Sequence, residues 1–529
     1  MTTVGEALVD ALQARGTEIV FGIPGVHTVE LYRGLARSKI RHVTPRHEQG
    51  AGFMADGYAR ATGKPGVAFV ITGPGMTNIL TAMGQARADS IPMLVISGVN
   101  QRAVLGLGHG HLHELPDQRG LVAHVAVTSE RIEDPAQLGP ALDRAFAIFA
   151  SDRPGPVHIE IPIDVMSLDA DIPATVPAPA PVTAPPGQID GAVALLKAAR
   201  RPLILAGGGA RGAGAELAAL ATALGAPVVQ TVNARGLMHG HDLAVPASPS
   251  LRTLQAEIRA ADCVIAVGTE FGRTDYDMYA RGDAPWPRPL IRIDISAAQL
   301  ARHPAEIAIR AHAAPAMRAL TAALGNGSAA EGGAARAARL RAAAWDEIGP
   351  EMQGHVAILN AVRTALPGAT IVGDSTQAVY AGNLYYDHDR AGGWFNAATG
   401  FGTLGYSIPA AIGTALGAPG HPVICLVGDG GAQFTLPELM TARQEGAPVL
   451  FLVWNNHAYL EIASSMAAVG IEVIGCHPAP PDFAALAAAM SLPYAQVPQD
   501  PARIAEALAG MQRAGGPALI EIAATRGQT

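Results

Sequence analysis

The sequence predicts an α/β protein made of three doubly wound domains, each built around a parallel sheet. The first observation is the length of 529 residues, which at about 100–200 residues per domain suggests three domains. The second is that short apolar runs alternate with helical patterns along the chain. The third is that 49% of the residues are hydrophobic and 16% charged, which is enough apolar material for large buried cores.

The predicted strands are short runs that are apolar on both faces. Such runs are typical of strands buried in parallel sheets, and the helical patterns between them predict the crossovers of βαβ units. The clearest examples are residues 18–23, 66–72, 92–97, 202–207, 263–268, 422–428 and 448–454.

Two changes of composition divide the chain. Residues 167–188 are rich in Pro and Ala and predict an extended linker on the surface. A Gly-rich break begins at residue 325, and we assign residues 325–344 to a second linker. The predicted domains are therefore residues 1–166, 189–324 and 345–529.

Charge and composition exclude several classes of protein. Lys and Arg number 37 against 45 Asp and Glu, and no basic run contains interleaved aromatic residues, which argues against a nucleic-acid partner. No run of 18 apolar residues predicts a membrane span, and the acidic, amphipathic start does not resemble a signal peptide. The scattered Cys263, Cys425 and Cys476 predict neither disulfides nor a thiolate metal site, so we expect a cytoplasmic protein.

The strongest chemical signal lies in the predicted third domain. Residues 428–431 (Gly-Asp-Gly-Gly) follow one buried strand directly, and Asn455-Asn456 ends the next. The carboxyl ends of parallel strands are where open α/β sheets bind ligands. Asp429, Asn456 and a backbone carbonyl would leave three octahedral positions on Mg²⁺ for phosphate oxygens and water. The glycines would let backbone N–H groups approach the phosphates. The alternative is two turns without a ligand.

This constellation resembles the diphosphate motif of thiamine-diphosphate enzymes, which begins with Gly-Asp-Gly and closes with Asn-Asn. The order of parts resembles the superfamily of acetohydroxyacid synthase, benzaldehyde lyase and pyruvate decarboxylase over nearly the whole chain. The resemblance implies a pyrimidine-binding first domain, a central domain and a diphosphate-binding third domain. It also implies that Mg²⁺ is held by Asp429, Asn456 and the carbonyl of Ala458. The diphosphate would be lined by Gly428, Asp429, Gly430, Gly431, Asn456, Ser375, Thr376 and Gln377.

The resemblance implies roles at the cofactor rings for three further positions. Glu48, in the run RHEQGAGFMADGYAR, matches the glutamate that protonates the aminopyrimidine ring. Leu404 matches the aliphatic residue that bends the two rings toward each other, where many acetohydroxyacid synthases have Met. The carbonyl of Gly402 would accept from the 4′-amino group. The alternatives are a surface Glu at a helix start and an ordinary core Leu.

Three residues are candidates for contact with the substrate. His27 matches a histidine of benzaldehyde lyases, and His113 falls where acetohydroxyacid synthases have a glutamine, so both are also predicted catalytic residues. The alternation of His109, His111 and His113 suggests a metal site, but no further ligand set accompanies it. Glu461 and the run HLHELPDQ resemble 2-ketoarginine decarboxylases, in which a carboxylate would pair with a guanidinium. The alternative for Glu461 is a solvated helix residue.

The central domain contains a dinucleotide-like pattern. Gly207, Gly209 and Gly212 follow a strand with the spacing G-x-G-x-x-G, but the next strand lacks the acidic residue that binds ribose. A nicotinamide oxidoreductase would leave Glu48 and the Asp429 motif unexplained. FAD is a less favoured cofactor here, with a structural role.

The resemblance implies non-oxidative decarboxylation of a 2-oxo acid to an aldehyde through an ylide and an enamine. We expect 5-guanidino-2-oxopentanoate (2-ketoarginine) as the substrate. The alternatives are carboligation of pyruvate, as in acetolactate synthases, and a carboligase or lyase like benzaldehyde lyase. A scaffold with a decayed site would lack Glu48 or Asp429, and both are present. We expect a homodimer or homotetramer whose active sites combine residues of two chains.

Overall fold

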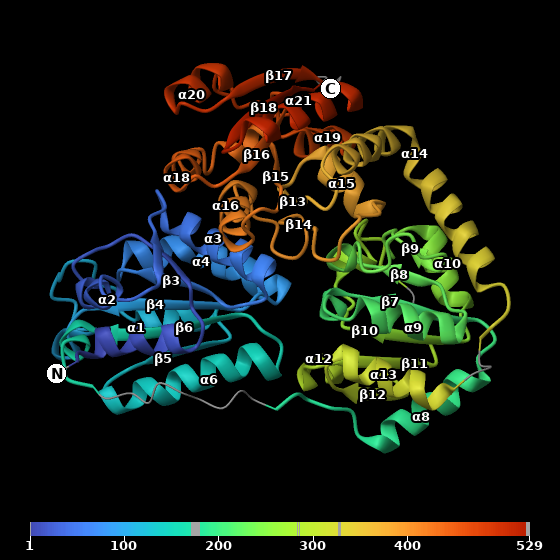
Figure 1. Ribbon diagram of the computed structural model, residues 1–529, viewed down its shortest axis with the longest axis horizontal. Helices are drawn as coiled ribbons and strands as arrows, with labels where there is room; N and C mark the ends of the chain where they lie inside the picture. The colour runs from blue at the N-terminus through green and yellow to red at the C-terminus, as the bar shows by residue number, and fades with distance from the viewer. Residues whose placement is uncertain (1, 171–179, 283, 285, 326–328, 525–529) are drawn as a thin grey trace.

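The computed structural model describes residues 2–170, 180–282, 284, 286–325 and 329–524. These residues form three parallel sheets of six strands each, and helices cover the faces of every sheet (Figure 1). The predicted fold class is confirmed. In Figure 1 the first and central domains lie side by side, and the third domain lies above both.

The first domain has the strand order β2-β1-β3-β4-β6-β5. Its strands are β1 (Ile19–Gly22), β2 (Arg41–Val43), β3 (Gly66–Val70), β4 (Met93–Val99), β5 (Thr128–Arg131) and β6 (Pro156–Pro162). Its helices are α1 (Val4–Ala14), α2 (Val29–Leu35), α3 (Glu48–Thr62), α4 (Pro74–Asp89), α5 (Gln118–Ala123), α6 (Leu138–Ser151) and α7 (Ile163–Met166).

The central domain has the strand order β12-β11-β10-β7-β8-β9, which is the order of dinucleotide-binding sheets. Its strands are β7 (Pro202–Ala206), β8 (Val228–Gln230), β9 (Ala244–Val245), β10 (Cys263–Val267), β11 (Leu290–Asp294) and β12 (Ile307–Arg310). Its helices are α8 (Pro186–Ala198), α9 (Gly214–Leu224), α10 (Arg252–Ala260), α11 (Arg273–Tyr276), α12 (Ala297–Arg302) and α13 (Ala313–Leu324).

The third domain repeats the topology of the first, with the strand order β14-β13-β15-β16-β18-β17. Its strands are β13 (Thr370–Gly373), β14 (Trp394–Asn396), β15 (Val423–Gly428), β16 (Val449–Asn455), β17 (Tyr494–Pro498) and β18 (Ala518–Ala523). Its helices are α14 (Gly333–Ala365), α15 (Gln377–Leu384), α16 (Ser407–Gly417), α17 (Asp429–Ala432), α18 (Glu438–Glu445), α19 (Leu460–Ala468), α20 (Phe483–Ala489) and α21 (Pro501–Ala514).

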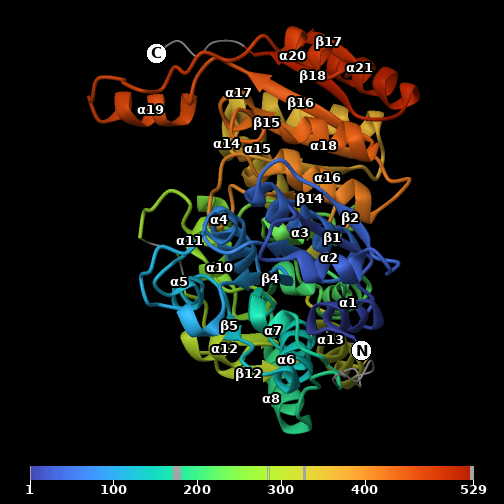
Figure 2. The ribbon, with the colours of Figure 1, turned by 90° about the vertical axis from the view of Figure 1, so that its left-hand side faces the viewer.

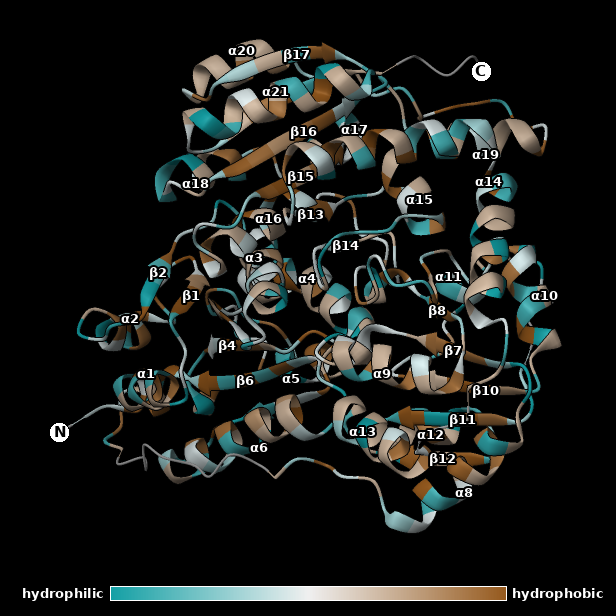
Figure 3. Cartoon of the chain, turned by 45° about the vertical axis from the view of Figure 1, so that its right-hand side comes forward, coloured by the Kyte–Doolittle hydropathy of each residue, from teal (hydrophilic) through white to brown (hydrophobic). Residues whose placement is uncertain are grey.

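The central strands are buried on both faces, as their apolar runs predict. Every residue of β3, β4, β10 and β16 is buried, and Figure 3 shows β16 in the hydrophobic colour under its covering helices. The apolar segments of the sequence are therefore the sheet cores. Within the described ranges, no helix is both long and apolar enough to cross a membrane.

Both linkers differ in part from the expectation. In the first, α8 already begins at Pro186, and residues 171–179 lie outside the described residues. In the second, residues 333–344 are helical, because they form the first turns of α14. Their Ala and Leu side chains pack on the central domain, where Ala337, Leu340 and Ala344 are buried. This burial outweighs the Gly-rich composition that suggested a linker.

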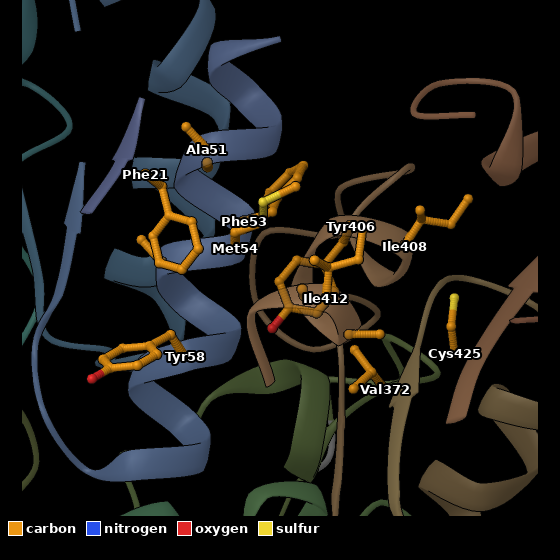
Figure 4. Close-up of a cluster of buried hydrophobic side chains, with 14 of the residues drawn as sticks. Phe21, Ala51, Phe53, Met54, Tyr58, Val372, Tyr406, Ile408, Ile412 and Cys425 are labelled. Atoms are coloured by element: carbon orange, nitrogen blue, oxygen red, sulfur yellow. The ribbon is translucent and has the colours of Figure 1, made fainter. Parts of the chain in front are cut away.

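Helices α3 and α16 join the first and third domains through one continuous core (Figure 4). A Cβ atom on Gly57 would lie 1.9 Å from the carbonyl oxygen of Ala410, and one on Gly413 would lie 1.9 Å from that of Met54. Only glycine allows the two backbones to approach this closely. The two helices are therefore locked in register by a pair of glycines.

A buried ionic network lies beside this helix pair. The Arg60 guanidinium contacts the carboxylates of Asp56 and Asp89, each at 2.6 Å, and the three side chains are 3% exposed or less. The hydroxyl group of Tyr406 donates to Asp56 from the third domain. Arg60 also lies over the ring of Phe395, 4.9 Å from its centroid. The network is therefore shared between the two domains.

Replacing Arg60 by Met is expected to lower the free energy of unfolding by about 3–5 kcal/mol, because two buried carboxylates would lose their cation. Urea denaturation at neutral pH measures the change. Arg33→Met is the control, since that side chain is 57% exposed and pairs with Glu30 of the same helix. If both variants unfolded at the same urea concentration as the unmodified protein, the network would not stabilise the fold.

Candidate cofactor and substrate site

The motif residues of the third domain meet at the carboxyl edge of its sheet. Strands β13, β15 and β16 are neighbours in the sheet and end at Gly373, Gly428 and Asn455. The backbone N–H of Asn456 donates to Asp429 Oδ1 at 3.2 Å, and Asn456 Nδ2 donates to Gln377 Oε1 at 3.0 Å. The structure therefore brings together the three segments that the sequence analysis assigned to the diphosphate: residues 375–377, 428–431 and 456–458.

Asp429 has the electrostatics of a cation ligand. It begins α17 and is only 1% exposed, and its Oδ2 atom is buried without a hydrogen-bond partner among the described residues. Burial raises the pKa of Asp429 above its ordinary value. A buried carboxylate oxygen without a partner is costly unless a cation neutralises it. Beside it, Asn456 Oδ1 accepts from the N–H of Ala458 at 3.1 Å.

Two residues at this edge were not identified from the sequence. The ring of Tyr459 covers Gly430, since a Cβ atom there would lie 2.4 Å from a ring carbon. Asp374 is fully buried behind Gly431 and accepts from the N–H groups of Ser375 at 2.8 Å and Ser407 at 3.5 Å. Burial raises the pKa of Asp374 to about 6. Asp374 follows a buried strand just as Asp429 does, so the same pattern could have revealed it.

The segment with Gly402 and Leu404 lies between β14 and α16. Gly402 is exposed with a φ of 75°, and Leu404 is half-buried. The hydroxyl group of Thr435, just after α17, donates to the carbonyl of Gly405 at 2.9 Å. Thr403 donates to Gln85 of α4 at 3.2 Å. This loop therefore connects the diphosphate edge with the first domain.

The predicted first-domain residues lie at the carboxyl edge of their own sheet. His27 follows β1, Glu48 follows β2 as the first residue of α3, and His113 follows β4. Glu48 is buried, and its Oε2 atom accepts from Asn78 Nδ2 of α4 at 2.9 Å. No sequence pattern distinguishes Asn78, because a single Asn within a helix belongs to no motif. It orients the Glu48 carboxylate from the side of α4.

The rings of His27 and His113 lie close together, although the two residues are 86 positions apart in the sequence. Their ring centroids are 5.5 Å apart. His27 is 4% exposed, and its Nε2 atom lies 3.0 Å from Asn100 Oδ1. Burial lowers the pKa of His27, which keeps the ring neutral at physiological pH. His113 has a φ of 61°, a conformation that non-glycine residues adopt rarely.

Gln118 is a further buried residue that the sequence did not reveal. Its Oε1 atom accepts from Thr72 Oγ1 at 2.8 Å and from the N–H of Gly73 at 3.0 Å. Its Nε2 atom donates to Glu160 Oε2 at 2.8 Å. Thr72 also donates to the carbonyl of His113 at 3.4 Å. Gln118 therefore holds the His113 loop against the junction of β3 and α4.

The remaining candidates lie apart from these two edges. Glu461 is exposed on α19, which projects from the body of the molecule in Figure 2. His109 and His111 are exposed with ring centroids 6.4 Å apart. Within the described ranges, no three His, Cys, Asp or Glu side chains form a group that could hold a metal ion. A site made of one carboxylate, one amide and one carbonyl would not form such a group.

The glycine pattern of the central domain lines a separate cavity of about 430 Å³. Gly207 and Gly209 lie in its wall, whereas Gly212 does not. The wall also includes Asp275, whose pKa is raised to about 6 by burial, and the carboxyl end of β11 at Asp294. The segment that follows β10 and the end of β11 therefore both reach this cavity.

Three family models match the chain in the order of its domains. The N-terminal binding domain of thiamine pyrophosphate enzymes matches residues 2–121, their central domain matches residues 189–320, and their C-terminal binding domain matches residues 374–522. The chain belongs to the thiamine pyrophosphate enzymes. It is therefore a thiamine-diphosphate-dependent enzyme, and the family resemblance read from the sequence is confirmed.

Curated relatives of this thiamine pyrophosphate enzyme extend over most of its length. The probable 2-ketoarginine decarboxylase AruI of Pseudomonas aeruginosa is 46% identical over 94% of this chain and 90% of its own. The acetolactate synthase isozyme 1 large subunit of Escherichia coli is 30% identical over 86% of this chain and 82% of its own. A probable acetolactate synthase large subunit of Methanocaldococcus jannaschii is 33% identical, over 85% and 80% respectively.

The residues at the third-domain edge fit the family's cofactor. The unpartnered Oδ2 atom of Asp429 suits a divalent cation, and the amide oxygen of Asn456 is a neutral oxygen donor of the kind Mg²⁺ accepts. These observations support the assignment of the cofactor to this edge.

Proposed function

We propose that this enzyme decarboxylates a 2-oxo acid to an aldehyde without oxidation, and that 5-guanidino-2-oxopentanoate is its substrate. Thiamine diphosphate, when bound, supplies the nucleophilic carbon and the electron acceptor that loss of CO₂ requires. Asp429, Asn456 and the carbonyl of Ala458 would hold Mg²⁺. Residues 375–377 and 428–431 would hold the diphosphate, with Gly402 and Leu404 beside the rings.

The similarity to AruI is the observation that carries the proposal. AruI is 46% identical over nearly the full length of both chains, whereas the acetolactate synthases named above are 30–33% identical. The name of that relative refers to a keto acid with a guanidino group. A guanidino keto acid needs a counter-charge in the substrate pocket, because an unpaired cation is costly to remove from water.

Glu461 is the carboxylate that we assign to this role. It lies on the first turn of α19, three residues beyond Ala458. Burial raises the pKa of Tyr380 in α15 and of Tyr279 in the central domain, and the charge of Glu461 adds to the rise at each. The carboxylate of Glu461 is therefore near enough to both tyrosines for its charge to act on them. A guanidinium between these groups could pair bidentately with the carboxylate.

Replacing Glu461 by Gln is expected to raise KM for the guanidino keto acid by about 10- to 100-fold, because one charge-assisted pair contributes about 1.5–3 kcal/mol. KM for an aliphatic keto acid should change little. Steady-state kinetics with both substrates measure the difference. Glu472→Gln, which removes an exposed charge just after the same helix, is the control. An equal effect on both substrates would remove Glu461 from the pocket.

The test of the proposed reaction is CO₂ release from a panel of keto acids with added thiamine diphosphate and Mg²⁺. The panel contains pyruvate and branched, aromatic and guanidino keto acids, and mass spectrometry identifies the products. Preference for the guanidino acid with an aldehyde product supports the proposal. Acetolactate from pyruvate would favour the synthase alternative, and coupling of two aldehydes would favour a benzaldehyde-lyase-like reaction.

We also propose that the active enzyme is a homodimer or homotetramer with shared sites. The hydrogen bonds of the described residues connect neither His27, Glu48 nor His113 to Asp429 or Asn456. Each edge is incomplete alone, so a second chain would supply the missing half. His27 and His113 would then face the substrate from the first domain.

FAD in the central cavity is the less favoured addition to this assignment. The cavity volume and the strand order of the central sheet support a nucleotide there, but the ribose-binding acidic residue is missing after β8. Absorbance of the supernatant after denaturation of the purified enzyme tests for it. A flavin spectrum would support a structural FAD. A colourless supernatant would indicate that thiamine diphosphate is the organic cofactor without FAD.

A further inference from the structure

The orientation of the Asn100 side chain is fixed by its two neighbours. Its Nδ2 atom lies 3.2 Å from the carbonyl oxygen of Leu112, which can only accept a hydrogen bond. The amide nitrogen must therefore point to Leu112, and the amide oxygen must point to His27 Nε2 at 3.0 Å. Asn100 is 8% exposed and directly follows β4.

This orientation decides the tautomer of His27. Because Asn100 Oδ1 only accepts, His27 Nε2 must carry the proton. In the neutral ring, Nδ1 then holds a lone pair. That atom is buried and has no hydrogen-bond partner among the described residues. The same is true of Nδ1 of His113, whose ring lies 5.5 Å away and is the titratable neighbour whose charge acts on His27.

We propose that Asn100 is a positioning residue that holds His27 as the Nε2–H tautomer and so presents Nδ1 as the proton acceptor of the active site. The inference rests on the proposed function for its role in turnover. The 2-oxo oxygen of the substrate would become a hydroxyl group during turnover, and release of the aldehyde would pass its proton to His27: the O–H bond breaks, its electron pair forms the C=O bond, the pair that held this carbon to the cofactor returns to the cofactor, and the Nδ1 lone pair forms the new N–H bond. The resulting imidazolium keeps its hydrogen bond to Asn100.

Asn100 also couples the two histidines. Its hydrogen bond to Leu112 holds the residue that precedes His113, where the backbone takes its rare left-handed conformation. The side-chain amide of Asn100 thus fixes both the tautomer of His27 and the backbone position of the residue before His113.

Two substitutions of Asn100 separate positioning from packing. Asn100→Leu keeps the branched shape of the side chain but cannot accept, and should lower kcat by about 10-fold or more while KM changes less than threefold. Asn100→Asp still accepts from Nε2, and its charge should stabilise the imidazolium. It should retain activity, with the acidic limb of the pH profile moved upward by about one pH unit. Asn360→Leu, on the distant α14, is the control.

A double variant provides the decisive kinetic comparison. In a His27→Gln background, Asn100→Leu should cause little further loss, because the group that it positions is already absent. Multiplying effects of the two substitutions would overturn the proposal, and so would an unchanged acidic limb in Asn100→Asp.

A spectroscopic readout tests the tautomer without any turnover. NMR of the protein with isotope-labelled histidine distinguishes a protonated from an unprotonated Nδ1, and the His27→Gln variant identifies the signals. We expect an unprotonated Nδ1 in the unmodified protein and loss of this preference in Asn100→Leu. A protonated Nδ1 in the unmodified protein would overturn the inference. If the tautomer is as expected but no keto acid is decarboxylated, the proposed function fails instead.

Discussion

Replacing Glu48 by Gln is expected to reduce turnover by about 100-fold or more, with binding of thiamine diphosphate and Mg²⁺ largely retained. Loss of one positioned acid typically costs about 10²–10⁴ in rate. Gln keeps the size of the side chain and an oxygen that can accept from Asn78, but it cannot share a proton with the cofactor ring. CO₂ release measures turnover, and quenching of intrinsic fluorescence measures cofactor binding.

Glu130→Gln is the matched control for this experiment. Glu130 lies in the same domain and forms an exposed ion pair with Arg144, so its loss should change neither quantity. Near-normal turnover in Glu48→Gln would refute the assignment of Glu48 as the acid at the pyrimidine ring.

Replacing Asp429 by Asn is expected to have a comparably large effect for a different reason. The variant loses the anionic ligand, so the apparent affinity for Mg²⁺ should fall by about 100-fold, as expected when a buried, charged contact is lost. Thiamine diphosphate should then fail to bind at micromolar Mg²⁺. Removing the metal from the unmodified enzyme with EDTA should reproduce the loss, and added Mg²⁺ should reverse it.

Asp346→Asn controls for the loss of one negative charge, because Asp346 is exposed on α14. Cofactor binding by Asp429→Asn that is as tight as in the unmodified enzyme, with the same dependence on Mg²⁺, would exclude Asp429 as the metal ligand.

Mixing the two inactive variants tests whether the sites are shared. In a heterodimer of Glu48→Gln and Asp429→Asn chains, one site would carry both substitutions and the other would carry neither. Co-expression should therefore restore roughly a quarter of the normal activity, since half of the random pairs are heterodimers with one intact site. A mixture as inactive as its components would place Glu48 and Asp429 of one chain in the same site.

The fold could be predicted because its strands are apolar on both faces. The runs at residues 66–72 and 448–454 coincide with β3 and β16, and helices must separate parallel strands. The start of α14 could not be predicted in the same way. The Gly-rich sequence before it resembles a linker, and its helix is stabilised by packing on the central domain, which local composition does not encode.

The site residues that could be predicted from the sequence are those in the segments that follow predicted strands. Asp429, Asn456, His27 and His113 all lie in such segments, and the structure places each at the edge of a sheet. Asn100 also follows a strand, but a lone Asn there is common in turns and acquires meaning only from its contacts. Gln118 starts α5 and Asn78 lies inside α4, so their roles depend on tertiary neighbours that no sequence pattern specifies.

The close contact of α3 and α16 has a mechanical consequence for an enzyme with shared sites. Glu48 begins α3, and the loop with Leu404 leads into α16, so one chain would contribute these two ends to two different sites. Backbone contact through Gly57 and Gly413 leaves no compressible side chain between the helices. A displacement of Glu48 on closure of one site would therefore be transmitted as a rigid movement to the ring-bending loop of the other.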